Sequence, residues 1–234
     1  MELIPVENFF FLLFPLAVVW YYYRKWVDNS KEIIYATLRM VVQLVLIGYA
    51  LVYIFENDSF YIGLFFIFIM IAMSSYIVLR NIQNSSLSSY FVVFLAIAVG
   101  GTVNLVLVIK FVLELTPFYE PRYVIPIAGM IYANAMNAVS LAAERFEQEI
   151  KTSTYKEALK VAFKASMIPT INSFFAVGIV SLPGMMTGQI LSGVDPLVAV
   201  RYQIVVMAMV LGSSGLSVIL YLKMISKKID INHG

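Results

Sequence analysis

The chain has 234 residues, of which 61% are apolar and 13% are charged, and its formal net charge is +2. A soluble domain has about 45–50% apolar and about 25% charged residues, whereas a disordered chain combines low hydrophobicity with high net charge. The composition excludes both classes and predicts an all-α, polytopic integral membrane protein. Nucleic-acid binding is not expected either, because it requires a dense basic patch.

Residue types that serve catalysis and metal binding are scarce in this sequence. The chain has no cysteine, and its one histidine is His233. Disulfides, iron–sulfur clusters and Cys-ligated zinc are therefore excluded. The sequence also lacks a GxxxxGKS/T phosphate loop and the HExxH and GxSxG motifs. We predict a protein that is not an enzyme and binds no cofactor or metal of its own, powered by a separate subunit or by an ion gradient.

Seven stretches are apolar enough to be membrane spans, which need about 20 residues each. They are residues 8–23, 35–55, 59–79, 90–109, 123–143, 165–194 and 202–222. The first stretch follows Glu2 and Glu7 and precedes Arg24 and Lys25, the reverse of the charge order in a signal peptide. It is therefore predicted to be an uncleaved helix whose amino end is outside.

The basic residues predict the same orientation, because Lys and Arg concentrate in cytoplasmic loops. With the N-terminus outside, twelve of the sixteen basic residues lie inside: Arg24, Lys25, Lys31, Arg80, Arg145, Lys151, Lys156, Lys160, Lys164, Lys223, Lys227 and Lys228. The outer loop at residues 56–58 is acidic. We expect a single transmembrane domain over residues 1–234, with a cytoplasmic C-terminus, in the plasma or inner membrane.

The longest hydrophilic stretch, residues 144–167, is predicted to be an inner loop that contains a short helix. Thr154 and Glu157 have the spacing of a capping box. An apolar face follows at Ala158, Val161, Ala162 and Ala165, while Lys156, Lys160 and Lys164 form a basic face. The stretch is either an interfacial helix that contacts membrane lipid or a docking surface for a cytoplasmic partner.

Polar side chains inside spans need a partner or a water-filled cavity. Arg39 and Gln43 share a face of the second span, where Arg39 either extends to the inner interface or has a function. In the fifth span, Asn137, Ser140 and Glu144 follow i, i+3, i+7 spacing, with Asn134 one turn earlier. Such a stripe is a helix-packing or dimer face or a substrate path.

Residues 181–196 are the least helix-like part of the apolar sequence. Pro183 and Gly184 can break the sixth span, and Asp195 followed by Pro196 predicts the start of another helix. Irregular backbone at membrane depth is tolerated where it lines a cavity, and broken helices are common at transporter sites. Met185 and Met186 could bind a soft metal, although filling of space is the favoured interpretation.

Several stretches resemble the FetB-like family of ABC transporter permeases, which is implicated in iron export and has plant relatives linked to aluminium tolerance. They are RMVVQLVLIGY at residues 39–49, IPIAGMIYANAM at 125–136, IPTINS at 168–173, VSLPGMMTGQILSGVDP at 180–196 and RYQI at 201–204. The resemblance implies a homodimeric permease that works with a cytoplasmic ABC ATPase subunit, which uses the ATP.

The inner loop departs from the family pattern. Family members usually have a longer loop with a Gly-Ala-Thr-Pro element before the IPTINS-like motif, and residues 144–167 lack that element. Three explanations remain open. The helix that couples the permease to the ATPase is remodelled around residues 155–163, or coupling to the ATPase is impaired, or the chain was shortened.

The leading hypothesis is an ABC permease that exports iron or another metal ion or complex. A gradient-driven transporter or channel, or a scaffold that transports nothing, are the alternatives. We expect the substrate path or gate at Asn134, Asn137, Ser140, Asn172, Pro183, Gly184, Met185, Met186, Gln189 and Asp195. ATPase coupling is expected at Tyr155, Lys156, Glu157, Lys160 and Phe163. Because no His or Cys lies in a span, the residues favour a hard ion, a chelate or an organic solute.

Overall fold

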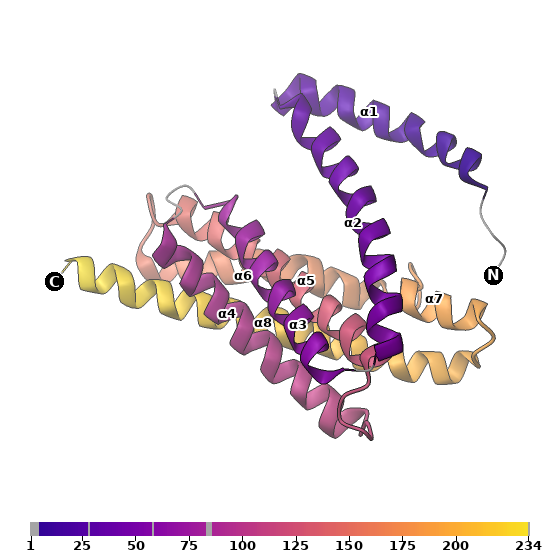
Figure 1. Ribbon diagram of the computed structural model, residues 1–234. Helices are drawn as coiled ribbons and strands as arrows, with labels where there is room; N and C mark the ends of the chain where they lie inside the picture. The colour runs from indigo at the N-terminus through magenta and orange to yellow at the C-terminus, as the bar shows by residue number, and fades with distance from the viewer. Residues whose placement is uncertain (1–4, 28, 58, 83–85, 234) are drawn as a thin grey trace. The chain divides into compact units, whose positions relative to one another are not determined.

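The computed structural model describes residues 5–27, 29–57, 59–82 and 86–233, which form mainly helices (Figure 1). No strand occurs in these ranges, and one isolated β-bridge joins Val177 and Ser181. The all-α prediction is therefore confirmed. The helices belong to two compact units, Met1–Asn57 and Asp58–Gly234.

The first unit is a helical hairpin. It consists of a 3-10 turn and two helices: Val6–Phe9, α1 (Phe10–Val27) and α2 (Ser30–Asn57). Tyr23 Oη donates to Glu32 Oε2 at 2.7 Å and links the end of α1 to the start of α2. α1 buries none of its residues, and its apolar side chains are largely exposed. Exposed apolar helices of this kind are stable when lipid surrounds them.

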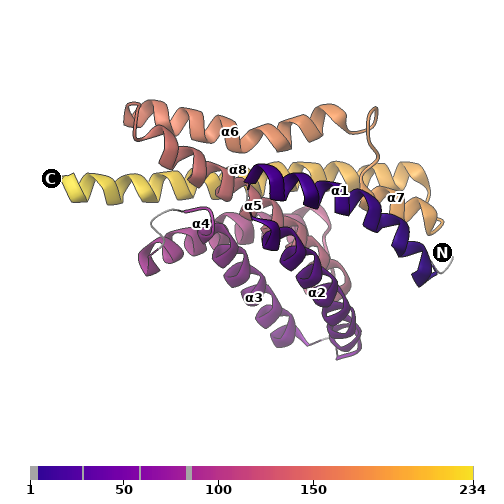
Figure 2. The same cartoon turned by 90° about the horizontal axis from the view of Figure 1, so that it is seen from above.

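The second unit is a bundle in which α5 packs against α3, α4, α6 and α8. Its elements are α3 (Phe60–Leu79), α4 (Leu87–Leu107) with a π-helical extension (Val108–Val112), α5 (Pro121–Glu149), α6 (Tyr155–Ala176), α7 (Gly184–Leu191) and α8 (Pro196–His233). Ile131, Tyr132 and Val139 of α5 are fully buried in the core. α6 and α8 run side by side, and α7 lies beside the amino-terminal part of α8 (Figure 2).

Small residues let α4 and α8 approach closely. A Cβ on Gly100 would lie 2.5 Å from Ser217 Oγ and 2.7 Å from the Ser217 backbone nitrogen. One turn further along α4, the Asn104 side chain packs against Gly212. Without a hydrophobic driving force between helices in lipid, such close contacts hold spans together. These contacts determine which face of α8 packs against α4.

Two helix starts that the sequence predicts are confirmed. Thr154 Oγ1 accepts a hydrogen bond from the Glu157 backbone N–H at 3.4 Å, and its hydroxyl lies 3.3 Å from Glu157 Oε2. Asp195 Oδ1 accepts from the backbone N–H groups of Leu197 at 2.8 Å and Val198 at 3.3 Å. These caps satisfy backbone donors that a helix start leaves unpaired, so α6 and α8 begin at defined residues.

The predicted sixth span, residues 165–194, is not one helix. α6 begins earlier, at Tyr155, and continues through Pro169 to Ala176. The chain then reverses: Val180 N–H and Ser181 N–H donate to the Ala176 carbonyl at 2.8 and 3.1 Å, and Gly178 has φ +86°. A left-handed φ suits glycine because it has no Cβ. The eight-residue helix α7 follows the reversal, so the predicted stretch is divided into three parts.

Among the described residues, five helices are long and apolar enough to cross a membrane: Lys31–Asn57, Phe60–Leu79, Leu87–Val112, Pro121–Glu149 and Pro196–Ile225. They match the second, third, fourth, fifth and seventh predicted spans. The first predicted span forms α1, which is not among the five. The structure thus supports a membrane protein with five candidate spans, while the count of seven and the orientation stay predictions.

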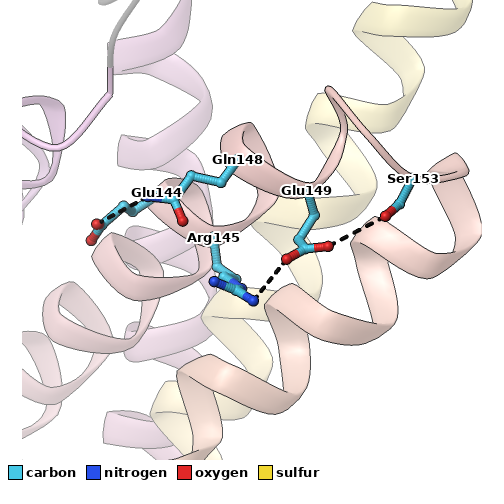
Figure 3. A network of polar contacts seen from close by, with 5 residues as sticks. All are labelled: Glu144, Arg145, Gln148, Glu149 and Ser153. Carbon is cyan, nitrogen blue, oxygen red and sulfur yellow. Dashed lines mark hydrogen bonds and ion pairs between the residues drawn. The ribbon is translucent and has the colours of Figure 1, made fainter.

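The predicted inner loop at residues 144–167 is mostly helical. α5 continues to Glu149 and α6 begins at Tyr155, so only residues 150–154 connect them. A polar network fixes this connection: Arg145 Nη2 pairs with Glu149 Oε1 at 2.7 Å, and Ser153 Oγ donates to Glu149 Oε2 at 3.3 Å (Figure 3). Gln148 donates to Glu144 at 3.5 Å beside them. The end of α5 and the start of α6 are therefore held as one polar corner.

Candidate functional site: the seam between α6 and α8

Three cavities follow one another along α6 where it packs against α8, and the middle one lies mainly between α6 and α5, with Val210 of α8 in its wall. We call this row of cavities the seam. From the first cavity to the third, the lining residues on α6 and its C-terminal end go from Tyr155 to Val177. Over the same cavities, the lining residues on α8 go in the opposite direction, from Lys223 to Val200. The two helices are therefore antiparallel along the seam. We call the cavities the basic groove, the amide pocket and the methionine groove, in that order.

The basic groove has a volume of about 360 Å³ and lies at the start of α6. Its lining residues are Tyr155, Leu159, Lys160, Phe163, Ile219, Leu222 and Lys223. The Tyr155 ring packs edge-on against Phe146 of α5, with the ring centroids 6.0 Å apart. Three of the five residues predicted for ATPase coupling thus form one wall of a groove. The other two, Lys156 and Glu157, are exposed and lie outside it.

The amide pocket is the smallest of the three, at about 110 Å³, and the most polar. Its lining residues are Asn134, Asn137, Ala138, Leu141, Ser166, Pro169, Thr170, Ser173 and Val210. Asn134 Nδ2 donates to the Met130 carbonyl at 2.8 Å, which directs that amide N–H to the backbone of its own helix. The structure therefore brings two predicted path residues, Asn134 and Asn137, together with Thr170, which lies in the IPTINS stretch but was not predicted as a path residue.

The oxygen atoms of the amide pocket carry no formal charge. Amide and hydroxyl oxygens suit hard cations or polar solutes, and soft metals prefer sulfur. The residues that the structure describes contain no group of three or more His, Cys, Asp or Glu side chains able to hold a metal. The arrangement therefore offers weak oxygen contacts rather than a tight metal centre. Weak, successive contacts are what conduction through a pathway requires.

The methionine groove, about 380 Å³, lies at the far end of the seam. It is lined by Phe174, Val177, Gly178, Leu182, Met186, Val200, Gln203, Ile204, Met207 and Ala208. Gln203 is 5% exposed, and its Oε1 has no hydrogen-bond partner among the described residues. A buried amide oxygen without a partner is costly, so Gln203 is a candidate ligand contact. Sequence reasoning missed Gln203 and Met207, because folding alone places them opposite Met186.

The remaining predicted path residues lie elsewhere in the second unit. Ser140 is buried and accepts a hydrogen bond from Asn81 Nδ2 at 3.1 Å, so it joins α5 to the end of α3. Asp195 caps α8, and Pro183 is the residue before α7. None of the following lines a cavity of the seam: Ser140, Asn172, Pro183, Gly184, Met185, Gln189 and Asp195. The predicted stripe is thus divided, with Asn137 at the seam and Ser140 in the core.

Arg39 and Gln43 belong to α2 in the first unit and lie one turn apart on that helix. Gln43 is exposed and Arg39 is half-buried. Their position on one face of α2 agrees with the spacing argument. Whether they extend to the interface or have a further role stays a prediction.

A larger cavity, the aromatic cavity of about 640 Å³, lies between α3, α4 and the start of α5. Its lining residues are Phe60, Tyr61, Leu64, Phe65, Ile67, Phe68, Ile71, Thr102, Leu105, Val106, Ile109, Phe118, Tyr119, Val124 and Tyr132. The hydroxyls of Thr102 and Tyr132 are hydrogen-bonded to each other at 3.0 Å. No charged or amide side chain lines it, so it is a weaker candidate for a polar substrate than the seam.

Comparison with known proteins places the chain in a family. The model of an uncharacterised protein family, UPF0014, matches residues 6–157 and 151–229. The two matched segments overlap at residues 151–157, around the connection between α5 and α6. No solved protein structure matches the chain significantly.

Relatives are similar over most of their length. The UPF0014 membrane protein YjkA of Bacillus subtilis is 35% identical over 82% of this chain and 81% of its own. The probable iron export permease protein FetB of Escherichia coli is 35% identical over 82% of this chain and 78% of its own. The protein ALUMINUM SENSITIVE 3 of Arabidopsis thaliana is 33% identical over 86% and 78%. With its five candidate spans, the chain is a membrane protein that belongs to the UPF0014 family.

Proposed function

We propose that this chain is the permease subunit of an ABC transporter that exports a metal ion or metal complex across the plasma or inner membrane. The relative named as a probable iron export permease supports the transported class. The observation that carries the proposal is the row of three cavities along α6, with neutral amide and hydroxyl oxygens in the middle cavity, which lies mainly between α5 and α6. The chain is not itself an enzyme, and it acts as a homodimer.

The substrate path follows the seam between α6 and α8. A solute from the cytoplasm passes Asn134, Asn137 and Thr170 in the amide pocket and reaches Gln203 and Met186 in the methionine groove, and the basic groove is not part of this path. Polar groups at membrane depth are costly unless they pair or face a water-filled space. Neutral oxygens let a hard cation or a chelate pass without holding it tightly.

Energy comes from a cytoplasmic ATPase subunit, which contacts the start of α6. Lys156 and Glu157 are exposed there and lie outside the basic groove, with Lys156 one turn before Lys160. α6 is one continuous helix from Tyr155 to Ala176, and its residues contribute to all three cavities. A displacement at its first turn is therefore transmitted to the amide pocket and to the reversal at Gly178.

The proposal is tested by reconstitution. Proteoliposomes containing the chain, with and without the ABC ATPase of the same organism, are loaded with Fe²⁺ or an Fe³⁺ chelate, and ATP-dependent transport is measured. We expect transport that requires both subunits and ATP. Equal transport by the chain alone would instead indicate a gradient-driven transporter or channel, and assembly without transport would indicate a scaffold.

A further inference from the structure

The basic groove has a pair of lysines that the transport path does not use. Two lysines, Lys160 on α6 and Lys223 on α8, lie at an otherwise apolar groove whose floor includes Leu159, Phe163 and Leu222. Both lysines are exposed, and neither forms an ion pair within the part of the chain whose side chains are described. The groove therefore presents two uncompensated positive charges beside an apolar surface.

The position of the groove on α8 indicates its depth in the bilayer. The uncharged stretch of α8, residues 202–222, ends immediately before Lys223, so Lys223 lies at the boundary of the apolar part, while Ile219 and Leu222 lie within it. The groove thus crosses from the depth of acyl chains to the depth of headgroups. Lys223 can place its ammonium group at the interface while its methylene groups stay in apolar surroundings.

We propose that this groove binds an anionic phospholipid, with the phosphate between Lys160 and Lys223 and one acyl chain along Leu159, Phe163 and Leu222. Basic pockets between membrane helices on the cytoplasmic side suit such headgroups. The Tyr155 hydroxyl is buried and has no hydrogen-bond partner among the described residues, so it can donate to a lipid oxygen. An acidic peptide would satisfy the lysines but would not extend among apolar side chains at hydrocarbon depth.

Bound lipid would fill the cytoplasmic end of the seam. It would pack against α6 next to Lys156 and Glu157, where we place the ATPase contact. The lipid composition of the membrane would then influence how α6 moves. The lipid site itself does not depend on the ATPase or on the substrate, and its place on the cytoplasmic side rests on the proposed orientation of the chain.

The test measures binding of spin-labelled phosphatidylglycerol and phosphatidylcholine to the purified full-length chain in detergent. We expect Lys160→Gln and Lys223→Gln each to raise the Kd for phosphatidylglycerol about fivefold, and the double variant roughly 25-fold. Phosphatidylcholine binding should change less than twofold. Lys164→Gln is the matched control, because Lys164 is an exposed lysine on the same helix outside the groove.

A variant that fills the groove gives an independent measurement. Leu222→Trp should weaken binding of both lipids, and circular dichroism should show unchanged helix content in every variant. The proposal is overturned if the double variant binds phosphatidylglycerol like the wild type, or if Lys164→Gln weakens binding as much as the groove variants. It is also overturned if the double variant loses only ATPase association, because the groove would then be a protein docking site.

Discussion

The aromatic cavity is larger than the amide pocket of the seam, but its walls are much less polar. The aromatic cavity is about 640 Å³, and the hydroxyls of Thr102 and Tyr132 in its wall are hydrogen-bonded to each other. The amide pocket of the seam is about 110 Å³ but holds two amides and several hydroxyls. In a bilayer, an apolar cavity can be filled by lipid, whereas polar atoms at membrane depth are costly unless they pair or face water. Polarity at membrane depth is therefore a better guide to a transport path than volume.

The largest effect is expected when the amide pocket of the seam is made as apolar as the aromatic cavity. The double variant Asn134→Leu, Asn137→Leu removes both amides from the amide pocket, and we expect transport with the ATPase to fall at least tenfold, or about 1.4 kcal/mol. Oligomer formation, measured by chemical crosslinking, should be unchanged. Phe65→Leu in the aromatic cavity is the control and should keep most of the transport. Loss of assembly in the double variant would favour a packing role for these amides instead.

A second change tests the support behind the seam. A Cβ on Gly100 would lie within 3 Å of Ser217 side-chain and backbone atoms, and overpacking of this kind costs about 1–3 kcal/mol. Gly100→Ala should therefore lower the Tm of the purified protein in detergent. Gly215→Ala is the matched control, because nothing lies within 4 Å of its added Cβ. An equal Tm for the two variants would show that α4 and α8 are less tightly packed than the structure indicates.

The cap of α6 gives a smaller, local effect. Thr154→Ala removes the acceptor of the Glu157 N–H, and loss of such a cap costs about 1 kcal/mol. Hydrogen exchange should become faster in the first turn of α6 and stay unchanged in the first turn of α8, which Asp195 caps. Thr152→Ala, two residues earlier, should have little effect. Uniformly faster exchange along the whole chain would argue against a local cap.

The smallest effect is expected in the aromatic cavity. Thr102→Val removes the hydrogen bond to Tyr132 and should destabilise the protein by about 1 kcal/mol, measured by thermal unfolding. Transport should remain within twofold of the wild type, because this cavity is outside the path. A loss of transport at unchanged stability would assign a role in transport to the aromatic cavity.

Local patterns predicted the helix ends well. Thr154 and Asp195 were identifiable because a cap and its partners lie within three residues of each other. The five candidate spans were also identifiable, because each is one continuous apolar stretch of the sequence. The predicted break at Pro183 and Gly184 coincides with the start of α7, whereas the earlier reversal was not predicted, because apolarity alone does not distinguish one helix from a helix, a reversal and a short second helix. Gly178, whose positive φ makes the reversal, has no neighbour that marks it as a turn residue.

The candidate site was harder to predict, since it depends on contacts between distant segments. Asn137 and Ser140 are on neighbouring parts of one helix surface, yet α6 faces the first and the end of α3 faces the second. Gln203 and Met207 acquire their place only when α8 packs antiparallel to α6. A helical stripe in the sequence does not reveal where one packing partner ends and the next begins.

The most direct test of the seam as the path uses the absence of native cysteines. Single variants Asn137→Cys and Thr170→Cys in the amide pocket, and Phe65→Cys and Val106→Cys in the aromatic cavity, are treated in membranes with a charged, water-soluble thiol reagent. Only a thiolate reached by water reacts quickly. We expect labelling of the two seam positions and none in the aromatic cavity. Unreactive seam positions, or equal labelling of both cavities, would contradict it.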